Sequence, residues 1–482
     1  MLSRAPTFLT AILTTSLVAG CVSVPRQGGF ADVERVVWQR TGLRIQWDQG
    51  RPEDLAVKEQ IQSLAKDPLT ADAAVQLALL QNRSLQAIFE EMGIAQADLV
   101  QAGLLQNPVF FNSTRFPNHA GLATNVEYSV VQNFFDILFL PLRKKLAAAQ
   151  FEQTKLRVSD AVLRLGAEVT SAYYILQGAQ QTLTMRRTAV QAAEVAAEFA
   201  QRQRQAGTLN ALDLANEQAA YQQAKLDLAR SEAGVRLDWE RLNRLMGFST
   251  AEVTWTTADQ LPELPPADPP AADLESVAVS QRLDLAAARK TVEILQRAMT
   301  VTRTGIIPSV DVGVDAEHDL DHAWVTGPTV ALALPIFDQR QAARARAQAQ
   351  LRQGQQQLVA LEAEARSEVR SAYERLRAAR TTAETYREAI LPLREQIITL
   401  SQQQYNFMLA GIYQLLQAKQ NEVNARRDYI EAIRDYWIAW ADLERAVGGK
   451  LPMAASGTPA TEPPTPQEVS EPSHQHQHGG HQ

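Results

Sequence analysis

One sequence feature limits the possible folds more than any other: a long pattern is present twice. The hexapeptide Glu-Val-Arg-Ser-Ala-Tyr at 368–373 repeats Glu-Val-Thr-Ser-Ala-Tyr at 168–173, 200 positions earlier. In both copies an apolar residue then recurs at every seventh position, which favours long helices that supercoil in the left-handed sense. The two ladders are Val169, Leu176, Leu183, Val190 and Ala197, and Val369, Leu376, Ala383, Ile390 and Ile397. The duplication predicts a fold built from two copies of one helical unit.

Each ladder leads into a helical hairpin. Both ladders end at Ala-Gly, where we expect Gly207 and Gly411 to supply the turn conformation that reverses one helix into an antiparallel partner. The long helices should span 142–205 and 339–409, each on the order of 100 Å at about 1.5 Å per residue. Pro392 should kink the second of them. Shorter return helices are predicted at 209–246 and 413–447.

Before each long helix the hydrophobic pattern changes from helical to strand-like. Helices are predicted at 69–105 and 273–304, each followed by two strand-like segments. These segments are 109–116, 125–137, 309–317 and 325–337. From Val310 to Ala316 apolar residues alternate with polar residues or glycine, as in a strand with lipid on one face and water on the other. The segments approach the roughly 9–11 residues that a tilted strand needs to cross a bilayer. A water-soluble sheet is the alternative.

Four strands per chain would leave two open sheet edges. Unpaired edges cannot persist in hydrocarbon, so the subunit should close a barrel with copies of itself. Three copies would give twelve strands, an even number within the known range. The predicted fold class is therefore mainly α with a small β part: duplicated long helical hairpins, four transmembrane strands per subunit, a trimeric twelve-stranded barrel and a periplasmic helical tunnel.

The first twenty residues have the composition of a signal peptide. Arg4 precedes an apolar stretch at 8–19 that is too short to span a bilayer, and Cys21, the only cysteine, follows it. A cysteine at this position is typical of a bacterial lipoprotein, so we expect Cys21 to be lipidated; an ordinary secretory signal is the alternative. Several acyl chains would give stable anchoring, and Val22 favours the outer membrane. Residues 21–68 should then form an extended, lipidated segment.

The other end of the chain, 449–482, lacks the apolar content to fold and should be disordered. Neutral imidazoles on a flexible tether can chelate Cu, Zn or Ni, so loose metal binding is one interpretation of this tail and a solvated low-complexity segment is the other. The four candidate ligands are His474, His476, His478 and His481. We expect no other cofactor.

Between these ends, the predicted repeats span 69–247 and 273–448, and a proline-rich linker at 248–272 separates them. The net charge of −7 offers no basic patch for nucleic acid. The sequence has no glycine-rich phosphate loop and no nucleophile elbow, and lipidation of Cys21 would leave it without a free thiol. We therefore predict that the protein is not an enzyme.

The repeated unit resembles the TolC-type outer membrane factors, the exit ducts of tripartite efflux pumps and of type I secretion. Residues 405–420, Tyr-Asn-Phe-Met-Leu-Ala-Gly-Ile-Tyr-Gln-Leu-Leu-Gln-Ala-Lys-Gln, are similar to the tyrosine, glycine and leucine-pair tip of that family. Residues 206–214 repeat the pattern, and the resemblance covers roughly 69–448. The lipid anchor and the tip sequence resemble outer membrane factors of heavy-metal export.

The resemblance implies a homotrimer in the outer membrane of a Gram-negative bacterium, lipid-anchored and with a large periplasmic part. Its implied partners are a periplasmic adaptor (membrane fusion protein) and an inner-membrane pump of the RND type. The implied function is a passive exit duct for heavy-metal cations such as copper. A drug or protein (type I secretion) export duct is one alternative, and a periplasmic coiled-coil scaffold lipoprotein is another.

The family also implies a tunnel entrance at the hairpin tips, where the adaptor docks. The matching residues are Gln205, Gly207, Asn210, Asp213, Gly411, Tyr413, Gln414 and Gln417. Family members often carry acidic residues just after the second tip, but this chain has Gln417 and Gln420 there. Asp213, after the first tip, would then supply one carboxylate per subunit.

Overall fold

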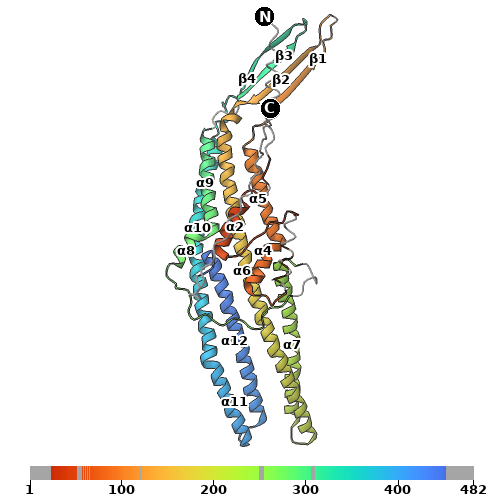
Figure 1. The fold of residues 1–482 in the computed structure, drawn as a ribbon, viewed down its shortest axis with the longest axis vertical. Coiled ribbons are helices and arrows are strands. Elements are labelled where there is room, and N and C mark those ends of the chain that lie inside the picture. Colours follow the sequence, from red (N-terminus) through yellow and green to blue (C-terminus); the bar gives the residue numbers. More distant parts are fainter. Residues whose placement is uncertain are drawn as a thin grey trace, which may run out of the picture.

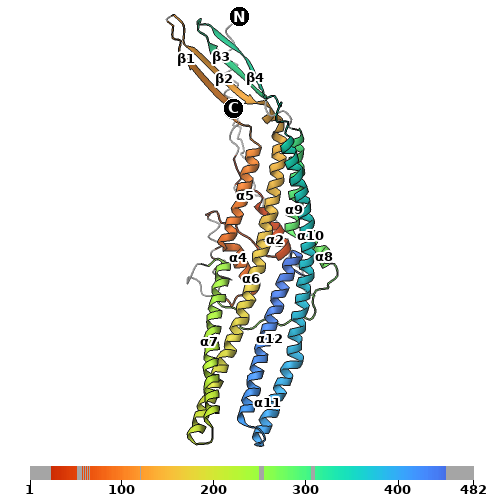
Figure 2. The ribbon, with the colours of Figure 1, turned by 180° about the vertical axis from the view of Figure 1, so that it is seen from behind.

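The protein is described here from a computed structural model, which describes residues 23–25, 27–51, 57, 59, 61, 63–64, 66–119, 121–248, 255–304 and 310–451. The molecule is long and narrow, with a β-sheet at one end and the tips of two helical hairpins at the other (Figures 1 and 2). Its elements are α2 (Phe30–Thr41), α4 (Ala71–Gln81), α5 (Arg83–Ala102), β1 (Val109–Arg115), β2 (Asn125–Asn133), α6 (Phe134–Gln205), α7 (Ala211–Met246), α8 (Leu274–Gln281), α9 (Leu283–Thr304), β3 (Val310–His318), β4 (Trp324–Leu332), α10 (Gln341–Thr385), the π-helix η1 (Tyr386–Ile390), α11 (Leu391–Asn406) and α12 (Ile412–Val447). The duplicated hairpins and the four strands are confirmed.

The sheet has one apolar and one polar face. Its strands are antiparallel in the order β1-β2-β3-β4. The register aligns Phe110, Val130 and Val314 across three strands, and all three side chains are exposed. On the opposite face, polar side chains pair across β2 and β3: Asn133 donates to Asp311 at 2.8 Å, and Asn125 donates to Glu317 at 2.7 Å. Among the described residues, no further strand pairs with β1 or β4.

Two strand predictions were too long. Residues 134–137 were assigned to a strand but form the start of α6, since an apolar run fits either structure. Pro141 lies inside this helix rather than in its first turn; a proline seven residues after the helix start removes one hydrogen bond without ending the helix. β4 ends at Leu332 instead of 337, because Pro335 cannot donate a ladder hydrogen bond.

The two helices that precede the strands are each broken in the middle, which the periodicity did not predict. The breaks are at Asn82 and at Arg282, 200 positions later. Asn82 donates to the carbonyl of Leu245 at 2.7 Å, and Arg282 donates to that of Ala446 at 3.3 Å. The side chain at each break therefore caps the C-terminal end of a return helix: Asn82 caps α7, and Arg282 caps α12. In each repeat the short helices lie end to end along the long helix (Figure 1).

The N-terminal segment is not wholly extended as predicted, because it contains α2. Phe30, Val33 and Val37 lie on the buried side of this helix, at the spacing of one helical face. Phe30 contacts Trp47, with ring centroids 5.8 Å apart, and Phe89 of α5 at 5.4 Å. This aromatic cluster attaches the N-terminal segment to the first repeat.

Pro392 interrupts the second long helix as predicted, and does so through a π-turn. In η1 the amide of Leu391 donates to the carbonyl of Tyr386, five residues earlier. One extra residue in a turn rotates the following helix by about 100°. The seven-residue ladder is buried up to Ala383, but Ile397, beyond the π-turn, is 41% exposed. The prediction that the ladder continues to Ile397 was therefore wrong.

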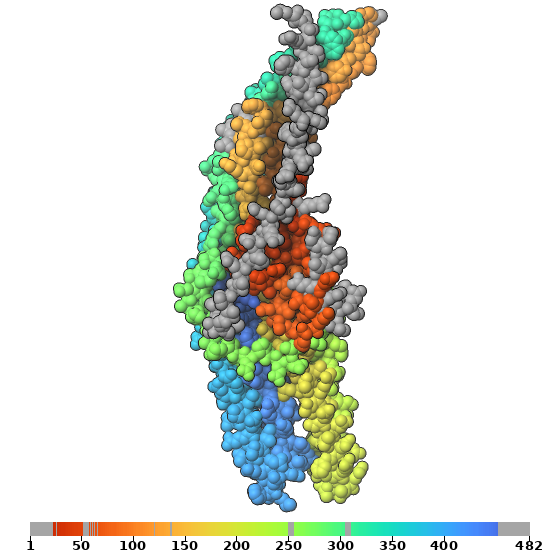
Figure 3. All heavy atoms as spheres, in the orientation of Figure 1, coloured from red at the N-terminus to blue at the C-terminus, as the bar shows by residue number. Residues whose placement is uncertain are grey.

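The linker between the repeats crosses the middle of the molecule as a band (light green in Figure 3). The Trp437 indole donates to the carbonyl of Pro262 at 2.9 Å, and Gln177 donates to the carbonyls of Ala258 and Gln260 at 2.9 and 2.6 Å. The linker therefore binds α12 of the second repeat and α6 of the first. Thr257 of the linker also forms a single parallel β-bridge with Leu69.

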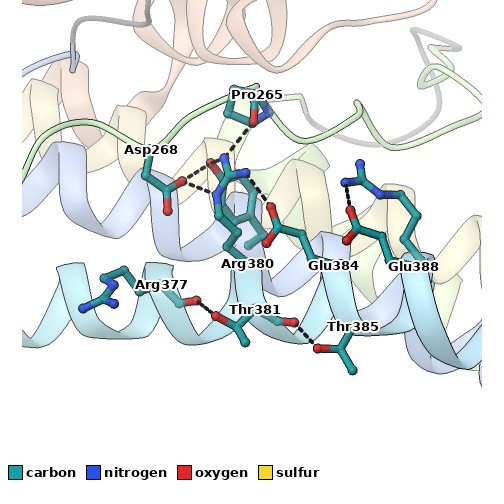
Figure 4. Close-up of polar contacts among 10 residues, drawn as sticks. Pro265, Asp268, Arg377, Arg380, Thr381, Glu384, Thr385 and Glu388 are labelled. Atoms are coloured by element: carbon teal, nitrogen blue, oxygen red, sulfur yellow. Dashed lines mark hydrogen bonds and ion pairs between the residues drawn. The ribbon is translucent and has the colours of Figure 1, made fainter.

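The strongest linker contact is made by Arg380 of α10 (Figure 4). Its guanidinium donates to Asp268 at 2.7 Å, to the carbonyl of Pro265 at 2.8 Å and to Glu384 at 2.9 Å. Tyr436 of α12 also donates to Asp268, at 2.9 Å. Burial would lower the pKa of Arg380, but these partners hold it above its ordinary value. The linker is thus fixed to both helices of the second hairpin, nearly two turns before η1.

None of the described helices has an apolar stretch of the length needed to cross a membrane.

Candidate functional site

The predicted entrance residues lie at the two hairpin tips, at the end of the molecule opposite the sheet (Figure 1). At the first tip, Gly207 adopts φ +75°, the left-handed conformation that the sequence predicted. Asn210 caps α7 by accepting from the amide of Asp213 at 2.8 Å and donates to the Asp213 carboxylate at 2.7 Å. Arg204 donates to the carbonyl of Leu209 at 3.1 Å. Local hydrogen bonds therefore fix the position of Asp213.

The second tip has a different turn. The residue with positive φ is Met408, at +59°, whereas Gly411 has φ −76° and precedes α12 in an extended conformation. The prediction that Gly411 supplies the left-handed turn was therefore wrong. The amides of Leu409 and Ala410 both donate to the carbonyl of Gln404, at 2.8 and 3.3 Å. These two hydrogen bonds close the turn around Met408, before the chain reaches Gly411.

The second tip also exposes a short apolar ridge, which we define as Phe407, Met408 and Leu409. Their exposed fractions are 75%, 94% and 79%. Three consecutive exposed apolar residues at the end of a helical hairpin are costly in water and typical of a surface that another protein covers. The site prediction did not include them, although an apolar triplet directly before Ala-Gly was visible in the sequence.

The first tip carries a pair of carboxylates, because Glu217 follows Asp213 by one helical turn on α7. Burial and the charge of Asp213 raise the pKa of Glu217. Burial and the charges of Glu217 and Asp213 also raise the pKa of Tyr413, at the start of α12. The Tyr413 hydroxyl is buried and has no hydrogen-bond partner among the described residues. The two tips are thus electrostatically coupled within one subunit. Sequence reasoning selected Asp213 and Tyr413 but missed Glu217.

The remaining predicted entrance residues are polar and exposed. Gln205 is the last residue of α6, and Gln414 and Gln417 lie in the first two turns of α12. Gln417 donates to Asn421 on its own helix at 3.2 Å. These three side chains are available at the surface of the tips, but the structure gives none of them a contact with the Asp213–Glu217 pair.

An ion-pair network braces the second hairpin above its tip. Glu422 of α12 is 3% exposed and accepts from Lys419 at 2.6 Å and from Arg426. Arg426 also donates to Glu395 of α11 at 2.7 Å. Burial would raise the pKa of Glu422, but hydrogen bonds from Lys419 and Arg426 outweigh it and hold the pKa below its ordinary value. The network ties α12 to α11 on the tip side of the π-turn.

Two predicted sites lie outside the described residues: Cys21, and the tail histidines His474, His476, His478 and His481. In the part of the chain that the structure describes, no three His, Cys, Asp or Glu side chains are grouped as metal ligands.

Comparisons with known proteins agree with this architecture. Residues 274–449 match the sequence model of the family described as outer membrane efflux protein. The cobalt-zinc-cadmium resistance protein CzcC of Cupriavidus metallidurans is 23% identical over 395 residues, covering 80% of this chain and 91% of that protein.

Solved structures share the fold of the chain. The CmeC outer membrane channel of Campylobacter jejuni matches with a TM-score of 0.68 and 15% identity, covering 80% of this chain and 87% of that one. CusC, whose structures show conformational changes that accompany folding and transmembrane channel formation, matches with a TM-score of 0.65 and 14% identity, covering 79% of this chain and 92% of that one. A membrane protein of Pseudomonas aeruginosa matches with a TM-score of 0.67 and 19% identity, covering 78% and 93%.

Proposed function

We propose that this chain, which belongs to the outer membrane efflux protein family and has a TolC-type fold, is the outer membrane exit duct of a tripartite efflux system. Three copies assemble into the conducting unit. The sheets form the part that crosses the outer membrane, and the long helices form a tunnel in the periplasm. The duct is a passive conduit rather than an enzyme, and the energy for export comes from an inner-membrane pump of the RND type.

The observation that carries this proposal is the amphipathic sheet with two open edges. Val312 and Val314 on one face of β3 are 43% and 63% exposed, while Asp311 and Asp315 alternate with them on the other face. A sheet that exposes valines to water, and whose outer edges at β1 and β4 are unpaired among the described residues, is unstable in isolation. Closure with two further copies pairs both edges, turns the apolar face to lipid and encloses the carboxylates.

The tips are the periplasmic entrance and the surface to which the adaptor docks. The apolar ridge Phe407–Leu409 supplies a surface that a partner hairpin can cover, and the polar residues around it supply specificity. Gln205, Gly207, Asn210, Gly411, Gln414 and Gln417 belong to this docking surface in the proposal. Opening is a shift between two populations that binding of the adaptor and pump biases, not a chemical step.

Heavy-metal cations are the proposed cargo. A relative named for cobalt, zinc and cadmium resistance supports this choice, as does the carboxylate pair Asp213–Glu217 beside the second tip. In a trimer the pair would place six carboxylates near the entrance, which attracts cations without holding them. Export of drugs or of proteins is the alternative cargo, and a periplasmic scaffold is the alternative of another class.

The proposal also includes both ends of the chain, which lie outside the described residues. Lipidation at Cys21 would anchor the N-terminal segment in the outer membrane. The four tail histidines would bind Cu, Zn or Ni loosely.

Single-channel conductance of the purified protein in planar bilayers tests this function. We expect discrete conductance steps with cation preference, and we expect Asp213→Asn with Glu217→Gln to reduce that preference. The matched control is Glu198→Gln on α6, which removes a charge above the tip. A sample that neither forms a trimer nor inserts into bilayers would contradict the duct and favour the scaffold. Steps without cation preference would contradict the cargo alone.

A further inference from the structure

A cavity of about 630 Å³ lies at the middle of the molecule, where the end of α12 meets the break between α8 and α9. Residues of both repeats line it: α4 and α6 from the first, and α10 and α12 from the second. Its volume is within the range of sites that hold small organic molecules. It is far from the hairpin tips, and the proposed duct does not use it.

One wall of the cavity is aromatic. Tyr174 of α6 stacks on Trp437 of α12, with ring centroids 5.5 Å apart and planes inclined by 24°. Trp440 lies one turn further along α12, with its ring centroid 6.1 Å from that of Trp437. Aromatic faces carry partial negative charge, and they attract cations and pack against apolar groups.

The Tyr174 hydroxyl is the polar atom of this wall that is left without a partner. The side chain is 9% exposed, and its hydroxyl makes no hydrogen bond within the described structure. Burial is the main reason that the pKa of Tyr174 is raised, and the charges of Asp72 and Glu444 contribute. Asp72 and Glu444 line the same cavity, and a phenol oxygen without a partner there can accept from a hydrogen-bond donor.

The chain already places one ammonium group at this cavity. Lys450, just after α12, donates to Asp72 at 2.9 Å and is half exposed. Glu444 accepts from the backbone amide of Leu451 at 3.1 Å and from the Trp440 side chain. Burial raises the pKa of Glu444, while these two donors and Lys450 lower it. The carboxylates that line the cavity outnumber its cationic side chains: Asp72, Asp160, Asp284, Glu364, Glu368 and Glu444 face Arg164, Arg282, Arg445 and Lys450.

The buried guanidinium on the opposite side of the cavity does not reverse this balance. Arg282 pairs with Asp284 at 2.7 Å and with Glu368 at 2.5 Å. Two carboxylates compensate its single charge, so Arg282 is not free to bind an anionic ligand.

We propose that the cavity binds an organic ammonium compound with an apolar body. The ammonium group lies between the Asp72 and Glu444 carboxylates and donates to the Tyr174 hydroxyl. The apolar body packs along the wall formed by Trp437 and Trp440. Because the site joins α4 and α6 to α12, an occupied cavity links the two repeats.

Isothermal titration of the full-length protein in nanodiscs with 2-phenylethylammonium chloride tests the site. Its neutral analogue 2-phenylethanol and the anion 3-phenylpropanoate are the matched probes, since they share the ring and differ in the head group. We expect saturable binding of the ammonium compound only, weakening as salt is raised. No saturable heat, or equal binding of the alcohol, would overturn the proposal.

Three variants locate the ligand. Glu444→Gln keeps an acceptor for Leu451 but removes the charge, and should weaken binding about tenfold. Tyr174→Phe keeps the stacking and should weaken it roughly threefold. Lys450→Met frees Asp72 from its internal ammonium and should tighten binding roughly threefold. A merely structural role of these residues predicts no gain for Lys450→Met.

Glu198→Gln, outside the cavity, is the control for a general charge effect and should leave the affinity unchanged. Trimer migration on a gel verifies that each variant is folded. If folded Glu444→Gln and Tyr174→Phe bind the ammonium compound as the unmodified protein does, the assignment of the cavity is wrong.

Discussion

At the scale of single residues, the two tip glycines have different roles although they occupy matching sequence positions. Gly207 has φ +75°, a conformation that costs other residues about 1–2 kcal/mol. Gly411 has φ −76°, and among the described residues no atom lies within 4 Å of a Cβ added to it. The left-handed position of the second tip is taken by Met408 instead, whose exposed side chain belongs to the proposed docking surface.

The glycine pair gives the first prediction. Gly207→Ala should make the first tip open more easily, and its amides at 203–213 should exchange about five- to tenfold faster with deuterium. Gly411→Ala is the matched control and should leave exchange at 404–414 unchanged. Mass-spectrometric hydrogen exchange of the purified protein measures both. An equal effect of the two substitutions would contradict the assignment of the turns.

The carboxylate pair gives a pH prediction. Because the pKa of Glu217 is raised, Glu217 takes up a proton at a higher pH than an ordinary glutamate, about 4.3, as the solution is acidified. At neutral pH the cation preference should be at its full value. On acidification it should begin to fall at a pH above that of an ordinary glutamate. The reversal potential across a KCl gradient measures it. Glu217→Gln should remove this step and leave the part due to Asp213; a step that persists would assign it to another group.

At the scale of elements, the second hairpin differs from the first by its π-turn. Gly411 follows Gly207 by 204 positions, whereas Glu368 follows Glu168 by 200. The second copy thus contains extra residues between these points, and a π-turn is one way in which a helix absorbs an insertion. The linker fixes α10 through Arg380 just before η1, and the ion-pair network of Glu422 ties α11 to α12 beyond it. The π-turn is therefore a weak point between two fixed parts.

Pro392→Ala tests this view. The substitution restores an amide that can donate within the helix, so the segment 386–392 should become more regular and its amides should exchange several-fold more slowly. The effect should stop at Arg380, because the linker contacts there do not change. Pro141→Ala in α6, where the helix is already regular, is the control. Unchanged exchange at 386–392 would show that the insertion, and not the proline, maintains the π-turn.

Most elements could be predicted from the sequence because their signals are periodic. The duplicated hexapeptide and the seven-residue ladder predicted both long helices, and strict alternation predicted the strand at Val310–His318. What failed depended on single contacts between distant segments. Asn82 and Arg282 break their helices because each caps the end of another helix more than 160 positions away. No local pattern carries that information.

The candidate site was predictable to the same extent. Asp213 and Tyr413 were found from the tip motif, but Glu217 matters only because the tips of two repeats lie close enough for its charge to act on Tyr413. Ile397 was placed on the seam because the ladder assumed a continuous α-helix. The π-turn before Ile397 rotates this residue to an exposed position. A regular seven-residue spacing in the sequence does not reveal a π-turn.

At the scale of the whole molecule, the two ends need different surroundings. The sheet exposes apolar residues on one face, and the tips expose polar side chains around the short ridge Phe407–Leu409. Between them the linker and the stacked helix ends hold the two repeats together at the middle of the molecule (Figures 2 and 3). In the proposed duct other molecules complete both ends: further copies and lipid cover the sheet, and an adaptor covers the ridge.

The last prediction concerns the two faces of the sheet. Val314 lies at the centre of β3 on the apolar face, and Thr329, near the centre of β4, lies on the polar face and donates to Asp315. In a membrane, Val314→Lys places a charge in lipid at a cost of about 2–4 kcal/mol, whereas Thr329→Lys places it beside Asp315. We expect Val314→Lys to lose heat-modifiable trimers from the outer membrane fraction and Thr329→Lys to retain them. If both substitutions were tolerated equally, water would bathe both faces of the sheet, and the sheet would belong to a periplasmic scaffold rather than to a duct.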